Sequence, residues 1–195
     1  MHPLLGSFIS RNFYERFDPE EQFGSGRPAS DFAHDLPGTN GKSAVWMDVP
    51  AQRGKHQKDG TSWTRPAEVT VIARQLQAWM SSDAGKDLSF GVISFYKAQA
   101  DSIREQLKRK FGGIVNDDKQ LRVGTVDSFQ GMEFDVVFLS MVRTLPQNWQ
   151  PKDDDRDKQA RALFGHLCLY NRLNVAMSRQ KKLLVVVGDT GLLQS

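Results

Sequence analysis

The sequence predicts an α/β protein in which helices cover both faces of a parallel β-sheet. From about residue 40 onward, short apolar runs alternate with segments of helical periodicity. Residues 135–142 and 183–188 are apolar without alternation, which is typical of strands buried on both faces. Strand and helix signals that alternate along a chain indicate parallel strands joined by helices.

Each element has its own local signal. The helix expected at residues 66–81 has Pro66 in the first helical position and one apolar stripe. The helix expected at residues 96–111 is followed by two glycines, Gly112 and Gly113, that can end it. A further helix is expected at residues 169–180, and a short helical turn from Asp127. Strands are predicted at residues 43–49, 90–95, 121–126, 135–142 and 183–188.

Two polar stretches interrupt this alternation and suggest the domain organisation. Residues 1–40 are predicted to form an irregular N-terminal segment, because residues 18–41 are rich in Gly, Pro, Ser and Asp. Residues 41–195 then form the α/β domain. Within it, residues 147–161 read as a polar insertion, which is either a flexible segment or a solvated helix; a surface loop is the simplest interpretation.

Composition limits the class of protein. The chain has 195 residues, of which 39% are hydrophobic and 25% charged, as in an ordinary globular domain. Its net charge of +3 is compatible with nucleic-acid binding but does not establish it. The single cysteine, Cys168, lies in an apolar run, so we expect a core residue and a cytoplasmic, reducing environment. The scattered histidines predict no metal site, and no apolar run is long enough to span a membrane.

One segment imitates a nucleotide-binding loop. Residues 38–43 end in Gly-Lys-Ser, as a P-loop does. A P-loop also has a glycine five residues before its last glycine, where this chain has Leu36. A helix should then follow and direct its amino end at the phosphate, but residues 44–49 predict a strand. We therefore expect a sheet that lacks its own P-loop.

Two polar segments follow predicted strands. In the first, Ser94 could cap the next helix while Tyr96 packs at its start, or both could face a nucleic-acid backbone. In the second, Asp127 and Gln130 have the spacing of a capping box. That interpretation leaves four small or polar residues unexplained, and their density suits contacts to phosphate or ribose. They are Thr125, Ser128, Gly131 and Glu133.

A third polar segment contains two arginines. Arg172 and Arg179 are seven residues apart, which would place them on one helix face about 10 Å from each other. A solvated basic face is the simplest explanation, but paired arginines also neutralise charge on a transferring phosphate. We expect all three polar segments at the carboxyl ends of the strands, where open α/β sheets bind ligands.

In this order, the segments resemble the C-terminal motor domain of superfamily 1 helicases. The group includes the nonsense-mediated-decay helicase and the Okazaki-flap helicase–nuclease. Residues 94–99 resemble motif IV, residues 126–143 motif V with its following strand, and residues 172–179 motif VI. Met1-His2-Pro3, followed by Phe13-Tyr14, is similar to the segment after motif III. The resemblance implies a RecA-like fold of the P-loop-NTPase type.

The resemblance also implies roles for individual residues. Arg179 would be the arginine finger for ATP that is bound with Mg²⁺ on an N-terminal RecA-like domain, and Arg172 would support it. Near the nucleotide the family places Gln130, Gly131 and Glu133. The family also places four residues on the backbone of single-stranded nucleic acid, which is expected to be DNA rather than RNA. They are Ser94, Tyr96, Thr125 and Ser128.

The whole protein would then be an ATP-dependent helicase, and this chain alone would be inactive. The sequence departs from the family at Ser178 and Gln180, where threonine and alanine are common, and it lacks the family's Tyr-Arg pair before Met1. Two alternatives remain open. One is a binding module from a degenerate helicase relative that holds nucleic acid or protein without turnover. The other is an unrelated α/β enzyme that binds a nucleotide at residues 38–43.

Overall fold

A computed structural model describes residues 1–112, 115, 120–150 and 155–194. Its centre is a five-stranded sheet in the order β1-β7-β6-β4-β5, and all neighbouring strands are parallel. This confirms the predicted parallel α/β sheet. The strands are β1 (Ala44–Asp48), β4 (Phe90–Ser94), β5 (Leu121–Thr125), β6 (Phe134–Ser140) and β7 (Gln180–Gly188).

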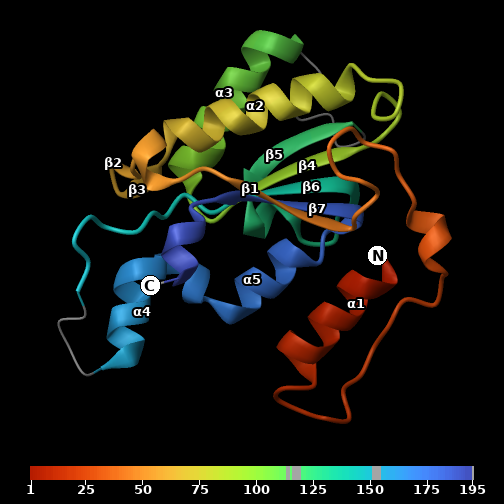
Figure 1. Cartoon of the computed structure of the whole chain (residues 1–195), viewed down its shortest axis with the longest axis horizontal. Coiled ribbons are helices and arrows are strands. Elements are labelled where there is room, and N and C mark those ends of the chain that lie inside the picture. The colour runs from red at the N-terminus through yellow and green to blue at the C-terminus, as the bar shows by residue number, and fades with distance from the viewer. Residues whose placement is uncertain (113–114, 116–119, 151–154, 195) are drawn as a thin grey trace.

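Helices cover both faces of the sheet and give three layers (Figure 1). Helices α2 (Pro66–Met80) and α3 (Lys97–Phe111) lie on one face, while α1 (Pro3–Ile9) and α5 (Tyr170–Met177) lie on the other. The central strand β6 sends alternate side chains into the two resulting cores. Val136 and Phe138 belong to the core under α2 and α3, whereas Val137 and Leu139 belong to the other. Burial on both faces explains why this strand has no polar alternation.

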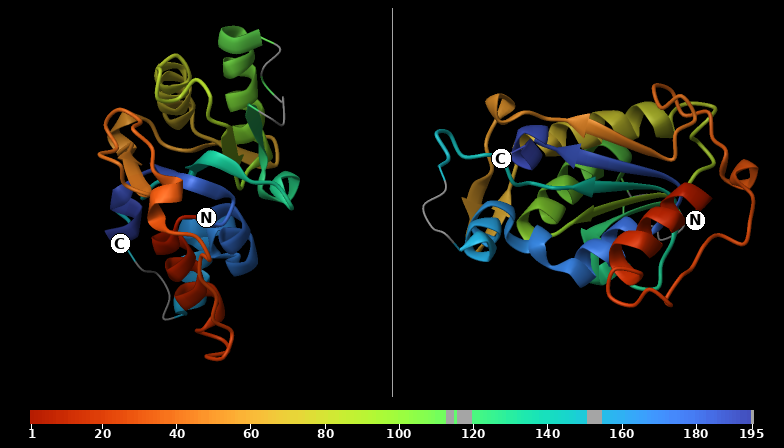
Figure 2. Two further views of the ribbon diagram at one scale, coloured as in Figure 1. Left: turned by 90° about the vertical axis from the view of Figure 1, so that its right-hand side faces the viewer. Right: turned by 60° about the horizontal axis from the view of Figure 1, so that its bottom comes forward.

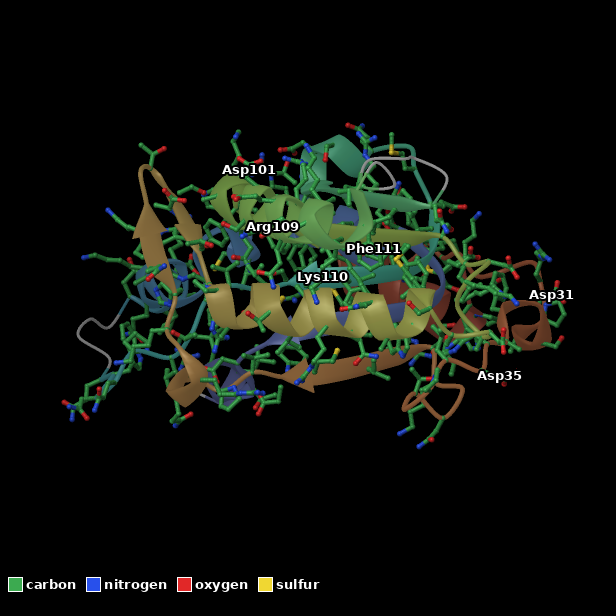
Figure 3. All side chains as sticks on the ribbon, turned by 90° about the horizontal axis from the view of Figure 1, so that it is seen from above. Asp31, Asp35, Asp101, Arg109, Lys110 and Phe111 are labelled. Atoms are coloured by element: carbon green, nitrogen blue, oxygen red, sulfur yellow. The ribbon has the colours of Figure 1, made fainter. Side chains whose placement is uncertain are left out.

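Helices α2 and α3 lie side by side over their face of the sheet, as Figure 3 shows from above. Both carry an apolar stripe toward the sheet, which includes Ile72 on α2 and Ile103 on α3. Lys110 on α3 donates a hydrogen bond to Gln77 Oε1 on α2 over 2.7 Å. Both helices therefore have the amphipathic character that their sequence periodicity predicts.

The N-terminal segment contains more helix than the sequence predicts. Residues 1–40 are predicted to be irregular, but α1 is followed by a π-helix, η1 (Ser10–Tyr14). His2 Nδ1 accepts a hydrogen bond from the Leu4 N–H over 3.2 Å, and Pro3 occupies the first turn. Leu5 is buried in the core beneath α5. The later part agrees better with the prediction, since η2 (Ala29–Phe32) is its one short helix among the described residues.

The boundary between α5 and β7 corrects a second expectation. The sequence predicts a helix at residues 169–180, but α5 ends at Met177 and β7 already begins at Gln180. Gln180 pairs with Phe134 at the start of β6, so the chain has to leave the helix before that point. Strand pairing therefore determines where this helix ends. Arg179 consequently lies outside the helix.

Two small elements lie beyond the carboxyl ends of the strands, on the left of Figure 1. One is an antiparallel hairpin of β2 (Gln57–Asp59) and β3 (Ser62–Thr64), which the sequence patterns do not predict. The other is helix α4 (Arg156–Phe164), which falls in and beyond the predicted polar insertion; residues 151–154 lie outside the described part. The right-hand view in Figure 2 shows α4 next to these strand ends. The described residues also form four further 3-10 helices: η3 (Ala51–Arg53), η5 (Val126–Phe129), η6 (Gly165–Cys168) and η7 (Thr190–Gln194).

The segment that imitates a P-loop has the predicted structure. Residues 37–41 form turns, with positive φ angles at Gly38, Asn40 and Gly41, and the chain then enters β1. No helix begins after residues 38–43, so no helix amino end is available there for a phosphate. Among the described helices, none is long and apolar enough to cross a membrane.

Candidate functional site

A fully buried ion pair supports the carboxyl edge of the sheet. Arg65 and Glu68 are both 0% exposed, and their side chains are 3.0 Å apart. Arg65 also donates hydrogen bonds to the backbone oxygens of Val49, Pro50 and Gly54. Burial raises the pKa of the Glu68 carboxyl, while its hydrogen bonds and Arg65 act in the opposite direction. The guanidinium thus joins the end of β1 to the start of α2.

Glu68 in turn fixes the chain just after β6. Its carboxylate accepts hydrogen bonds from Ser140 Oγ over 2.6 Å and from the Val142 N–H over 3.0 Å. Val142 has a φ of 68°, a left-handed conformation that is costly for a β-branched residue. The bond from Glu68 holds the chain in this conformation. The next residue, Arg143, is thereby directed at the region beyond the strand ends.

Arg143 connects elements that lie beyond the carboxyl ends of the strands. Its Nε donates a hydrogen bond to the Leu163 oxygen over 2.8 Å, and an Nη atom donates to the Ala162 oxygen. Both acceptors belong to the last turn of α4, where free carbonyl groups favour a cation. The guanidinium also lies 5.1 Å from the centre of the Trp63 ring on β3. Arg143, to which sequence reasoning gave no role, therefore links the hairpin to α4.

A pocket of about 460 Å³ opens between these elements. We call it the carboxyl-edge pocket; it is lined by residues 61–63, 95–97 and 125–127 with Arg143, Arg161, Gly165, His166 and Arg172. Three arginines and Lys97 line it, against one carboxylate, that of Asp127. Such a concentration of positive charge attracts an anionic backbone.

The four residues predicted to contact nucleic acid differ in exposure. Ser94 is 0% and Tyr96 only 4% exposed, whereas Thr125 and Ser128 are half-buried. Ser94 Oγ accepts a hydrogen bond from the Tyr96 N–H over 3.2 Å. It does not cap α3 as its position suggested, because the N-cap residue is Tyr96 and no side chain caps this helix. Ser128 Oγ donates to the Thr125 oxygen over 2.7 Å. Thr125 and Tyr96 line the carboxyl-edge pocket.

The residue that covers Tyr96 is His166 of η6. The two rings are stacked, with centroids 5.1 Å apart and planes inclined by 19°. The Tyr96 hydroxyl accepts a hydrogen bond from the His166 N–H over 3.4 Å. Burial raises the pKa of Tyr96, so its hydroxyl stays protonated at neutral pH. His166 itself is exposed and lines the carboxyl-edge pocket, although its sequence position gave no signal of a site.

Arg172 lies at the same edge. It is in the first turn of α5 and donates a hydrogen bond to Asp127 Oδ2 over 2.8 Å. The capping-box interpretation of Asp127 and Gln130 is therefore wrong, because η5 has no side-chain cap and the Asp127 carboxylate binds an arginine. The ion pair connects α5 with the turn after β5.

Arg179 lies at the opposite end of α5. The Phe134 N–H at the start of β6 donates to the Arg179 oxygen over 3.0 Å, which places Arg179 at the amino edge of the sheet. The expectation that Arg172 and Arg179 share one helix face at the carboxyl edge is therefore wrong. The Arg179 side chain is turned back, donating to the Val175 oxygen over 3.1 Å and to Ser178 Oγ over 2.9 Å.

Three residues are predicted near a nucleotide, and one of them, Glu133, adjoins the contact between Phe134 and Arg179. Gln130, Gly131 and Glu133 are exposed, and Glu133 immediately precedes Phe134. Gly131 has a φ of 77°, which only glycine adopts without strain. Glu133 also lines a pocket of about 580 Å³, here called the amino-edge pocket, together with Met1, Gly6, residues 23–27, Phe32 and Lys181.

His56 and Cys168 line neither of these two pockets. His56 Nδ1 accepts a hydrogen bond from the Thr144 N–H over 3.1 Å, and burial, Arg143 and Arg65 lower its pKa to about 4. Cys168 is exposed and not in the core as expected; partial burial raises its pKa, which disfavours the reactive thiolate. Within the described ranges, no three His, Cys, Asp or Glu residues gather as a metal site.

These features define a RecA-like α/β domain with a basic pocket at the carboxyl edge of its sheet and a further pocket at the amino edge. A family model described as AAA domain matches residues 1–191. RNA helicase Mov10l1 from Homo sapiens is 33% identical over 72% of this chain and 11% of its own length. Helicase SEN1 from Saccharomyces cerevisiae is 27% identical over 96% of this chain and 8% of its own length.

A third relative is the DNA polymerase alpha-associated DNA helicase A of Saccharomyces cerevisiae, 28% identical over 77% of this chain and 20% of that protein. The chain thus spans a fifth or less of each of these relatives. It belongs to the AAA domain family and is a RecA-like domain of the type found at the C-terminal side of superfamily 1 helicases.

Proposed function

We propose that this domain completes an ATP-dependent nucleic-acid motor by serving a different ligand at each end of α5. Arg179, just beyond the last residue of α5, lies at the amino edge of the sheet near Glu133. Arg172, in its first turn, lines the basic carboxyl-edge pocket. This separation of the two arginines carries the proposal, because one short helix then connects a nucleotide site with a strand-binding site.

The nucleotide binds at the amino edge of the sheet. Gln130, Gly131 and Glu133 face an N-terminal RecA-like domain, which supplies the P-loop that this chain lacks. ATP bound there with Mg²⁺ places its γ-phosphate within reach of Arg179. That other domain also supplies the ligands of the metal ion.

Arg179 has to change its hydrogen bonds to perform this role. Its guanidinium now contacts Val175 and Ser178, which are neutral acceptors. A phosphate is a stronger partner for a guanidinium than a carbonyl oxygen, because both groups are charged. Arrival of the nucleotide would therefore draw the side chain out from α5. An arginine finger accelerates phosphoryl transfer by roughly a thousand- to a hundred-thousand-fold.

The nucleic-acid strand binds at the carboxyl edge of the sheet. Thr125, Ser128 and Arg172 contact the phosphate backbone, which carries no sequence information. Both DNA and RNA are compatible with such contacts, and the named relatives include helicases of each kind. Ser94 and Tyr96 support this surface from beneath, since both side chains are buried.

The proposal is tested in a complete helicase that contains this domain. Arg179→Ala is expected to lower nucleic-acid-stimulated ATP hydrolysis at least a thousandfold, and Arg179→Lys to restore little, because lysine lacks the planar fork. The 195-residue chain alone should not hydrolyse ATP. Near-normal turnover in Arg179→Ala would remove Arg179 from the nucleotide site, and turnover by the pure chain would contradict the need for a second domain.

A further inference from the structure

The segment formed by α4 and η6, residues 156–168, covers part of the carboxyl edge (Figure 1). It is fixed there by several contacts. Arg143 binds the last carbonyl groups of α4, and His166 stacks on Tyr96. Leu163 and Leu167 are buried. The segment is therefore a packed part of the domain, although residues 156–161 belong to the stretch that the sequence predicts as a polar insertion.

A glycine between the two helices makes this packing possible. Gly165 has a φ of 56°, and a Cβ atom added there would lie 2.6 Å from the Tyr96 hydroxyl. The close approach brings His166 onto the Tyr96 ring. The His166 Nδ1–H also donates to the Phe95 oxygen over 3.4 Å, since a carbonyl oxygen only accepts. The imidazole is thus held by two partners from the turn after β4.

A nucleic-acid strand that reaches this edge would contact residues 156–168 before it contacts Tyr96. Tyr96 is 4% exposed, whereas His166 and Arg161 are exposed and line the carboxyl-edge pocket. Trp63 lines the same pocket from the hairpin. An exposed aromatic ring offers a stacking surface for an unpaired base, and a nearby arginine offers a partner for its phosphate.

We propose that Arg161 and His166 are nucleic-acid-binding residues, and that Tyr96 is a positioning residue that holds His166. Arg161 contacts a backbone phosphate, and the imidazole of His166 stacks on a base of a single strand. This inference rests on the proposed function, and it assigns part of the strand-binding site to residues 156–168. The occupant is a single strand, because paired bases do not expose their faces for stacking.

The test measures binding of fluorescein-labelled dT15 and U15 to the 195-residue chain by fluorescence anisotropy at several salt concentrations. Arg161→Gln is expected to weaken binding and to reduce the slope of log K against log salt by about one. His166→Ala is expected to weaken binding roughly five- to a hundredfold with an unchanged slope, because stacking releases no counterion. Unchanged affinity in both variants would overturn the inference.

A matched control is available on the same helix. Arg156 is the first residue of α4, is exposed and does not line the pocket, so Arg156→Gln removes the same charge away from the site. It should retain wild-type affinity within about twofold, because solvent and salt screen a surface charge that does not contact the strand. If Arg156→Gln and Arg161→Gln lose the same affinity for the oligonucleotide, the change in net charge alone explains the loss. That result would overturn the assignment of Arg161.

The positioning role of Tyr96 has its own readout. Tyr96→Phe keeps the stacked ring and should bind normally, whereas Tyr96→Leu removes the stack and should weaken binding as much as His166→Ala. The double variant with Tyr96→Leu and His166→Ala should bind no more weakly than either single variant, because both changes remove the same contact between the His166 ring and a base. Additive losses would overturn this role. If Tyr96→Leu does not fold, normal binding by His166→Ala still overturns the roles of His166 and Tyr96.

The same titrations separate this inference from the proposed function. Arg172→Gln should weaken binding if the carboxyl edge holds the strand at all. Loss in Arg172→Gln with no loss in Arg161→Gln or His166→Ala would overturn the role of residues 156–168 alone. A wild-type chain that binds neither oligonucleotide would contradict the proposed strand-binding site itself.

Discussion

Arg172 donates a hydrogen bond to the carboxylate of Asp127 over 2.8 Å, and this ion pair joins the start of α5 to the turn that follows β5. Both side chains remain partly exposed, at 38% and 64%. The pair lies at the rim of a pocket that is otherwise basic. Asp127 therefore limits the positive charge that this edge of the sheet presents.

Asp127→Asn should strengthen binding of a single-stranded oligonucleotide by up to about fivefold at low salt, because it removes one negative charge from the pocket. The gain should shrink as salt is added. Anisotropy titrations of the 195-residue chain measure it. Urea unfolding should show a change of less than about 1 kcal/mol. Weaker binding would mean instead that Asp127 is needed to orient Arg172.

The buried pair of Arg65 and Glu68 predicts a large effect on stability. Glu68→Gln leaves the Arg65 guanidinium buried without its carboxylate and weakens the hold on Val142. The free energy of unfolding should fall by about 3–5 kcal/mol. Urea unfolding monitored by circular dichroism provides the measurement.

A surface pair serves as the control for this variant. Asp83 contacts Lys86 over 3.0 Å with its side chain 99% exposed, so Asp83→Asn should leave the urea midpoint unchanged. Combining Arg65→Met with Glu68→Gln should cost less than the sum of the two single changes, since no unpaired charge remains. A small loss in Glu68→Gln would contradict the supporting role of this pair.

His56 predicts how stability depends on pH. Its pKa is lowered to about 4 in the folded protein, against about 6.5 for an unfolded histidine. The unfolded chain therefore binds the proton more readily. The contribution of neutral His56 to the stability of the folded protein is therefore complete above about pH 6.5 and is lost as the pH falls toward about 4. Protonation would also prevent Nδ1 from accepting the Thr144 N–H.

The measurement is urea unfolding of the wild type and of His56→Asn at several pH values between about 7 and about 4. The difference in stability between the two proteins should shrink as the pH falls, because asparagine does not titrate. Carboxylate titrations contribute equally to both proteins and cancel in this difference. A constant difference across the range would show that His56 is not linked to folding.

The strands could be predicted from sequence because burial on both faces leaves a direct signal. Val136 to Leu139 are apolar without interruption, and the structure sends them alternately into the two cores. The starts of the long helices are equally predictable, as Pro66 shows. The helix α1 also has a signal, since Pro3 stands at its first position and Leu5 and Ile9 share a face.

The end of α5 could not be predicted in this way. No glycine or proline follows Met177 directly, and the helix stops because Gln180 has to pair with Phe134. Tertiary pairing therefore places Arg179 at the amino edge. The bond between Glu68 and Val142 and the stack of His166 on Tyr96 likewise join segments whose proximity depends on the fold. Local patterns contain no information about such contacts.

If the two ends of α5 serve two different ligands, variants of Arg179 and Arg172 should have different defects. In a complete helicase, ATP hydrolysis is measured against nucleic-acid concentration for Arg179→Ala and Arg172→Ala. Arg179→Ala should lose the maximal rate while its affinity for the strand persists. Arg172→Ala should need more nucleic acid for half-maximal stimulation and should approach the normal maximal rate. The same defect in both variants would contradict the separation of the two sites.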